Sequence, residues 1–333
     1  MQTAFKFAAA FLAVASAGLG MAADDIRVER VTFQSHGHTL VGDLYLPAAL
    51  VPGQRAEAVV VTGAWTTIKE QMSGLYAAEL AERGYVALAF DFRTWGESGG
   101  DTRSLENPAM KIEDIIAAAE FLSQRSEVAE VNGLGICASA GYMAHVAENS
   151  DVFNSIALVA PWLHDAAIVS DVYGGEEGVK SLIETGQAAA ASERETGEPV
   201  LITAGGPSGS DALMPFDGYY SDPERGMVPE WENTFNVASW EGWLRFDGIR
   251  SASGITEPVF IVHSEAAAIP QGVRTFLSNL GGEKQELWLD GVTQFDFYDQ
   301  PQPISSAVDA VAEHFAFSGK QGVEMPPADR DDE

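Results

Sequence analysis

The stretch Leu-Gly-Ile-Cys-Ala-Ser-Ala-Gly at residues 134–141 decides the fold prediction. A short apolar run ends at Cys137, and a segment of helical period follows. Small residues stand two before and two after Cys137, as a sharp strand-to-helix turn requires when it presents a nucleophile. The same rule fits Ser139, whose neighbours at those positions are Cys137 and Gly141. The sequence predicts a nucleophile at this turn, with Cys137 and Ser139 as the two candidates.

Cys137 is the preferred candidate because this choice keeps Gly135 at the first of the small positions. A thiol at a helix N-terminus is expected to have a lowered pKa and to react without a strong base. A lone serine hydroxyl lacks that option. The alternative interpretation makes Cys137 a small buried apolar residue. It is the only cysteine, so the chain can form neither an intrachain disulfide nor a multi-cysteine metal site.

Short apolar runs alternate with amphipathic segments through most of the chain. Such runs are typical of strands covered on both faces, and the alternation predicts an α/β fold with a mostly parallel sheet and helices on both sides. The expected strands are 58–61, 86–90, 134–137, 156–160, 259–262 and 287–289, and the expected helices are 69–83, 110–125, 140–148, 270–280 and 305–317.

Before these runs, residues 28–33 and 39–46 alternate apolar and polar side chains around a Ser-His-Gly-His turn. This pattern predicts an N-terminal β-hairpin. His36 and His38 flank the turn glycine, and we expect exposed turn residues there rather than metal ligands.

The regular pattern stops between residues 162 and 255, a stretch too long for a loop in a compact domain. We expect an inserted cap over the carboxyl ends of the strands, with the α/β core formed by residues 23–161 and 256–318. We expect about half of the aromatic residues of the insertion to line a pocket and the rest to form the core of the cap. These residues are Tyr219, Tyr220, Trp231, Phe235, Trp240, Trp243 and Phe246.

The two ends of the chain and its charge predict where the protein works. Residues 1–22 resemble an export signal with cleavage after Ala22, because one lysine precedes a short apolar run and small residues follow it. Residues 319–333 are expected to form a disordered acidic tail. The net charge of −30 argues against binding to nucleic acids or anionic membranes. We therefore expect a periplasmic or secreted protein.

Three segments together resemble the α/β-hydrolase superfamily, and within it the dienelactone-hydrolase-like and S15-peptidase-like branch. Residues 135–139 resemble the Gly-x-Cys-x-Gly turn of dienelactone hydrolases, with Ser139 in place of the last glycine. Residues 91–100 resemble the loop after the fourth strand, and residues 291–299 resemble the segment that usually carries the catalytic histidine. The resemblance covers residues 28–317 without the cap and implies an oxyanion hole.

In this fold one oxyanion donor is the N–H of the residue after the nucleophile, and the other comes from the loop after the third strand. The first donor is the N–H of Ala138 if Cys137 is the nucleophile, or of Ala140 if Ser139 is. The second donor is the N–H of Ala64 or Trp65. The alternative is that the loop around Gly63 only makes a turn.

The catalytic base and acid depart from the family pattern. Gln294 occupies the expected histidine position, and the expected aspartate position holds Ala266, with Glu265 beside it. His164, which follows the sixth strand, is the candidate replacement base; its alternative role is a structural residue at the cap hinge. Gln294 could also join a hydrogen-bond network that orients water.

The leading functional prediction is an exported hydrolase of esters, thioesters or lactones, with Cys137 or Ser139 as nucleophile. In this prediction His164 and Glu265 transfer protons during the reaction. The substrate is a small acyl compound, and no cofactor or metal takes part. The alternative is a non-catalytic relative that binds a small apolar ligand or a partner, because both usual proton-transfer residues are replaced.

Overall fold

The structure of the protein is a computed structural model, and it describes residues 26–321. The predicted export signal at residues 1–22 and nearly all of the predicted acidic tail lie outside the described residues.

The centre of the fold is an eight-stranded sheet with the order β1-β2-β4-β3-β5-β6-β11-β12. β1 and β2 form the predicted antiparallel hairpin, β2 pairs antiparallel with β4, and all later neighbours pair in parallel. The strands are β1 (Arg27–Ser35), β2 (His38–Leu46), β3 (Ala56–Thr62), β4 (Val86–Phe90), β5 (Val128–Ile136), β6 (Ile156–Val159), β11 (Val259–His263) and β12 (Lys284–Trp288). The predicted mostly parallel sheet is confirmed.

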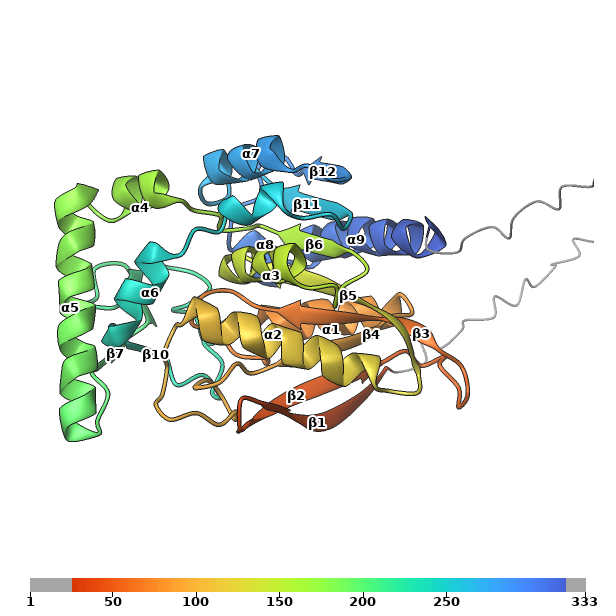
Figure 1. Cartoon of the computed structure of the whole chain (residues 1–333), viewed down its shortest axis with the longest axis horizontal. Helices are drawn as coiled ribbons and strands as arrows, with labels where there is room; N and C mark the ends of the chain where they lie inside the picture. The colour runs from red at the N-terminus through yellow and green to blue at the C-terminus, as the bar shows by residue number, and fades with distance from the viewer. Residues whose placement is uncertain (1–25, 322–333) are drawn as a thin grey trace, which may run out of the picture.

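Helices cover both faces of this sheet, as predicted (Figure 1). α1 (Met72–Glu82) and α9 (Pro301–Gln321) pack together on one face, and α2 (Pro108–Ser123) and α3 (Ala138–Asn149) pack together on the other. Two further helices follow β11 and β12, namely α7 (Pro270–Asn279) and the short α8 (Asp296–Asp299). The central strands β4 and β6 are buried at every position, because helices cover them from both sides.

The insertion lies at one end of the sheet, where α4, α5 and α6 stand together in Figure 1. It contains α4 (Ala166–Val172), α5 (Gly175–Thr196), β7 (Leu201–Thr203), β8 (Gly205–Gly206), β9 (Met214–Pro215), β10 (Thr234–Asn236), η1 (Val237–Ser239), α6 (Trp240–Arg245) and η2 (Arg250–Ser253). α5 is not among the helices expected from the sequence, because its 22 residues bury only Gly186 and Ala189 and leave a narrow apolar stripe.

The strand order places a crevice at the carboxyl ends of β3 and β5. The chain runs from β3 to β4 on one side and then returns to β5 on the other side of β3. The loops that follow β3 and β5 therefore leave the sheet in different directions. Open parallel sheets bind ligands at such a reversal of strand order, so the candidate site is sought where these two loops meet.

Candidate functional site

Cys137 occupies the turn between β5 and α3 in a strained backbone conformation, with φ 56° and ψ −118°. Its N–H donates to the Val159 carbonyl oxygen at 3.1 Å, and its own carbonyl oxygen accepts from the Trp162 N–H at 2.9 Å. Gly135 allows the helix to approach the strand, because a Cβ there would lie 2.8 Å from Cα of Ala140. The surrounding backbone thus holds the strained turn at Cys137.

Ser139, the other candidate nucleophile, lies one residue further into α3. Its side chain is fully buried, and its Oγ has no hydrogen-bond partner in the described part of the chain. Ser139 is absent from the cavity wall, whereas Cys137 belongs to it. The turn geometry therefore presents the thiol rather than the hydroxyl.

Four hydrogen-bonding groups act on the Cys137 thiol: the backbone N–H groups of Trp65 and Ala138, the Tyr298 hydroxyl and the Gln294 side-chain amide. Each favours the thiolate, but burial outweighs them and raises the pKa of Cys137. The expectation of a lowered pKa, based on the helix N-terminus alone, is wrong because the thiol lies in a largely apolar enclosure. Of the two candidate donors in the β3 loop, Trp65 faces the sulfur, while the Ala64 N–H points toward the Met72 sulfur at 3.5 Å.

Gln294 is held by three hydrogen bonds at the position where the resemblance implied a histidine. Its Oε1 accepts from the Ala268 N–H at 3.0 Å. Its Nε2 donates to the Ala160 carbonyl oxygen at 2.9 Å and to the Tyr298 hydroxyl at 3.0 Å. These partners fix the orientation of the amide. Gln294 therefore positions the Tyr298 hydroxyl, and it offers no group that titrates near neutral pH.

Tyr298 links Gln294 to the sulfur. Its side chain is buried, and burial raises its pKa well above the usual value, so the phenol stays protonated at neutral pH. Its oxygen accepts from Gln294 while its proton faces Cys137. A phenol in this position can accept one proton as it releases another. Tyr298 is not among the residues expected from the sequence, because Gln294 lies in a turn before α8 and no helical spacing joins the two residues.

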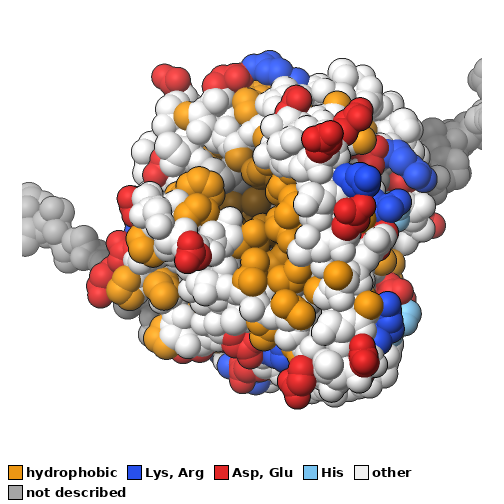
Figure 2. Space-filling model, turned by 90° about the vertical axis from the view of Figure 1, so that its left-hand side faces the viewer, with side chains coloured by type: hydrophobic (Ala, Val, Ile, Leu, Met, Phe, Trp, Pro, Cys, Tyr) orange, Lys and Arg blue, Asp and Glu red, His pale blue; other side chains and the backbone are white. Residues whose placement is uncertain are grey.

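A cavity of about 520 Å³ lies over Cys137. Figure 2 shows a hollow at the cap end of the molecule, with hydrophobic side chains gathered in and around it. Core loops supply Trp65, Cys137, Ala138, Trp162, Ala268, Gln294, Phe295 and Tyr298 to the wall, and the insertion supplies Val172, Tyr173, Leu213, Met214, Phe216, Tyr220, Trp240 and Trp243. Other predicted cap aromatics, such as Phe235, are buried in the cap core.

His164 lies outside this wall, packed beneath the cap. Its Nδ1 accepts from the Trp162 indole N–H at 2.8 Å, and its ring stands edge-on to Trp243 at 4.6 Å between centroids. Burial lowers the pKa of His164 to about 4, so the imidazole is neutral at pH 7. The structure does not bring His164 to Cys137. Its contacts match the alternative prediction, a structural residue at the base of the cap.

Glu265, the candidate acid, points away from the site. Its side chain is 62% exposed and forms an ion pair with Arg274. It is absent from the cavity wall, whereas its near neighbour Ala268 contributes both to the wall and to the Gln294 hydrogen bond. The chain thus supplies a backbone N–H at the point where an acid would orient a histidine.

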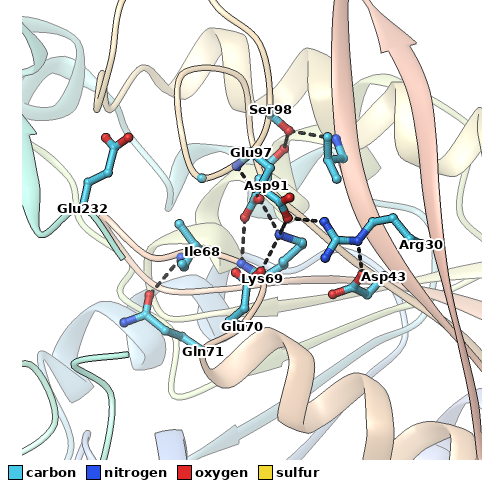
Figure 3. A network of polar contacts seen from close by, with 12 residues as sticks. Arg30, Asp43, Ile68, Lys69, Glu70, Gln71, Asp91, Glu97, Ser98 and Glu232 are labelled. Carbon is cyan, nitrogen blue, oxygen red and sulfur yellow. Dashed lines mark hydrogen bonds and ion pairs between the residues drawn. The ribbon is translucent and has the colours of Figure 1, made fainter. Parts of the chain in front are cut away.

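A buried ion network ties the loop after β3 to the loop after β4 (Figure 3). Lys69 Nζ lies 2.8 Å from Asp91, 2.5 Å from Glu70 and 2.6 Å from Glu97. Burial alone would lower the pKa of Lys69, but these carboxylates raise it. Gly96 is required beside them, because a Cβ there would lie 2.3 Å from an Asp91 carboxylate oxygen. This network anchors the far end of the loop that carries Trp65.

A second buried ion pair holds the same loop close to Trp65. The Thr66 N–H donates to Glu106 at 3.3 Å, and the same carboxylate accepts from Lys111 at 2.8 Å and from Tyr142 at 2.7 Å. The Trp231 indole N–H donates to the Thr66 carbonyl oxygen at 2.7 Å. Contacts from α2, α3 and the cap therefore fix the peptide that follows the Trp65 N–H.

Within residues 26–321, no group of three or more His, Cys, Asp or Glu side chains is arranged to hold a metal ion. The same part of the chain contains no helix with the length and apolar character needed to cross a membrane.

The fold agrees with the comparisons to known proteins. The chain is 32% identical over 287 residues to uncharacterized protein PA2218 of Pseudomonas aeruginosa, covering 81% of this chain and 76% of that protein. It is 29% identical to uncharacterized protein YcjY of Escherichia coli, over 82% of this chain and 92% of that protein. No protein-family model matches the chain.

Solved structures show the same architecture. The crystal structure of PA2218 superposes with a TM-score of 0.73 and 24% identity, covering 89% of this chain and 98% of that chain. The α/β-hydrolase GrgF from Penicillium sp. sh18 superposes with a TM-score of 0.71 and 18% identity over 89% of this chain and 98% of that chain. Neither comparison singles out the dienelactone-hydrolase or S15-peptidase branch. The chain is an α/β-hydrolase-fold protein and belongs to the family that includes PA2218 of Pseudomonas aeruginosa.

Proposed function

We propose that this protein is an exported acyl hydrolase that cleaves an ester, thioester or lactone through an acyl thioester on Cys137. The observation that supports this function is the strained turn at Cys137, whose sulfur meets the backbone N–H groups of Trp65 and Ala138. The pair of N–H groups can stabilise the oxyanion that forms when sulfur adds to a carbonyl carbon.

In the proposed reaction, the Cys137 sulfur forms a bond to the acyl carbon, and the oxyanion then collapses and breaks the bond to the leaving oxygen or sulfur. For this step the Tyr298 hydroxyl turns about its C–O bond from the sulfur toward the leaving group, so that its oxygen takes the thiol proton while the phenolic proton passes to the leaving group. Water next adds to the acyl carbon and gives one proton to the Tyr298 oxygen, the carbon–sulfur bond breaks, the phenolic proton passes to the Cys137 sulfur, and the free acid leaves. Gln294 keeps the Tyr298 oxygen in place through its 3.0 Å hydrogen bond.

The raised pKa of Cys137 favours activated acyl groups as substrates. A neutral thiol is a weaker nucleophile than a thiolate, so a good leaving group compensates for the absence of a strong base. Thioesters and strained lactones meet this requirement better than simple alkyl esters, and they are the preferred substrate classes within this proposal.

The test is turnover of a panel of 4-nitrophenyl esters, S-phenyl thioesters and small lactones by the natural chain and two variants. We expect Cys137→Ala to lower kcat/KM by at least about 10³-fold, while Ser139→Ala retains most of the activity. Hydrolysis that persists in Cys137→Ala would remove Cys137 from the mechanism.

A second candidate function, ligand binding without catalysis, is favoured by one feature. Both polar ends of Gln294 are occupied, and no histidine, aspartate or glutamate lines the cavity in the described part of the chain. If the whole panel shows no turnover while the protein still binds acyl compounds, this second function replaces the first.

Export rests on residues 1–22 and is tested separately. We expect the mature protein to begin near Ala23 and to fractionate with periplasmic or secreted proteins. A full-length N-terminus recovered from the cytoplasm would contradict this part of the proposal.

A further inference from the structure

We infer that the cavity over Cys137 selects an uncharged, largely apolar acyl group that carries a second hydrogen-bond acceptor away from the reacting carbonyl. This inference rests on the proposed function for the identity of the reacting carbonyl, and the rest of the cavity wall determines the remaining features of the ligand.

The wall contains no charged side chain among the described residues. A carboxylate or an ammonium group buried there would lose its hydration without gaining an ionic partner. The net charge of −30 adds long-range repulsion for anions. The cavity is therefore suited to neutral ligands.

Aromatic walls can also bind cations through their ring faces, but here the three tryptophans Trp65, Trp240 and Trp243 pack against one another. Trp65 stacks on Trp243 with centroids 5.0 Å apart and an angle of 29°, and it also packs against Trp240 at 6.0 Å. These contacts make the three tryptophans a packed wall rather than an open cage. An aryl ring can lie against such a wall by edge or offset contacts.

The cavity size agrees with one ring and its substituents. A volume of about 520 Å³ lies in the range of pockets that enclose a small organic molecule. At its mouth, Val172 is 42% exposed and Phe216 is 54% exposed, so an entering ligand first meets apolar side chains.

Tyr173 supplies the second polar contact. Its oxygen accepts from the Trp243 indole N–H at 2.7 Å, and its own hydroxyl proton has no recorded acceptor in the described part of the chain. Burial is the main cause that raises the pKa of Tyr173 to about 12, so the hydroxyl remains a donor at neutral pH. The reacting carbonyl uses the N–H groups of Trp65 and Ala138, so Tyr173 is left for a different acceptor on the ligand.

The experiment measures binding to the Cys137→Ala variant, so that no probe is turned over. The four probes are methyl 4-methoxybenzoate, methyl 4-ethylbenzoate, monomethyl terephthalate and methyl 4-(trimethylammonio)benzoate, and tryptophan fluorescence reports binding. The first two have nearly the same shape and differ in the acceptor oxygen. The last two carry a negative and a positive charge.

We expect the methoxy ester to bind about fivefold more tightly than the ethyl ester and at least about 10²-fold more tightly than either charged ester. Adding Tyr173→Phe should remove the preference for methoxy over ethyl and leave the preference for neutral probes unchanged. A charged ester that binds as tightly as the neutral ones, or no binding of any probe, would overturn the inference.

This outcome is distinguishable from failure of the proposed function. The binding ranking in Cys137→Ala does not depend on chemistry at residue 137. If the ranking holds while the natural chain never hydrolyses the same esters or their thioesters, the ligand class stands and the catalytic proposal fails. The comparison of neutral with charged esters is made in Cys137→Ala alone. It therefore still tests the inference if the Tyr173→Phe variant does not fold.

Discussion

Two segments reach Cys137 from opposite sides, and they differ in how closely they follow the α/β-hydrolase pattern expected from the sequence. On one side, the turn after β5 and the loop after β3 bring together a strained cysteine and two backbone N–H donors. On the other side, the segment after β12 carries Gln294 where the family pattern has histidine. The first side depends on backbone shape and the second on side-chain identity, so a single substitution can remove the second without disturbing the first.

The side formed by the turn after β5 and the loop after β3 lowers the free energy of unfolding, because it contains a strained residue and buried charges. A non-glycine residue at positive φ costs about 1–3 kcal/mol, and Lys69 and Lys111 are both buried ions behind the same loops. The replaced side is equally ordered, with three hydrogen bonds on one amide. This ordering indicates that Gln294 has a defined structural role beside the sulfur.

The largest expected change comes from restoring a base on the replaced side. Gln294→His places an imidazole beside Tyr298, and we expect kcat to rise by about 10²-fold. The gain should appear as pH rises through about 6 to 7, where the imidazole loses its proton and becomes a base. A pH–rate profile from 5 to 9 checks this. Gln294→Met, of similar length without hydrogen bonds, is the matched control and should lower kcat. A histidine variant with the pH profile of the natural chain would mean that residue 294 does not reach the proton path.

The next effect concerns the link between the two sides. Tyr298→Phe keeps the ring but removes the hydroxyl that joins Gln294 to Cys137. We expect kcat to fall by about 10- to 10²-fold with little change in KM. Tyr219→Phe is a suitable control, since Tyr219 packs against Tyr298 yet lies outside the cavity wall. Equal losses in both variants would indicate a packing effect instead of proton transfer.

Much of the fold and part of the site could be predicted from the sequence. The apolar runs located the parallel strands, because strands covered on both faces need continuous apolar residues. The small residues around Cys137 marked the turn, since Gly135 has no room for a side chain. The role of Tyr298 and the placement of His164 depend on how the cap and the last loop fold back over the sheet. No local pattern encodes such long-range contacts.

A smaller effect, on the pH dependence of stability, distinguishes His164 as a catalytic base from His164 as a structural residue at the cap. Because its folded-state pKa is about 4 and the unfolded value is about 6.5, the unfolded chain binds the extra proton first as pH falls. Stability is therefore expected to decrease from pH 6.5 toward pH 4. His263 and His314, also buried with pKa values near 4, add to this decrease. Urea unfolding midpoints at pH 7.5 and 5.0 measure the effect.

His164→Asn retains an oxygen that can accept from the Trp162 indole. This variant should show a smaller loss of stability between those pH values and keep turnover within about threefold. A complete loss of turnover in a folded His164→Asn protein would instead support His164 as the base.

The smallest expected effect is at Glu265. Glu265→Gln removes only an exposed ion pair with Arg274, so kcat/KM and the melting temperature should stay within about twofold and a degree or two of the natural chain. Steady-state kinetics and thermal unfolding suffice to check it. A large loss of activity would show that the loop after β11 rearranges to bring this carboxylate to the site.

The central claim, a covalent acyl group on Cys137, is tested most directly by intact-protein mass spectrometry after rapid acid quenching with 4-nitrophenyl butyrate. We expect a species heavier by one butyryl group, located by peptide mapping at Cys137 and absent from the Cys137→Ala variant. Turnover with no acylated protein at any time, or a butyryl group on Ser139, would contradict the claim.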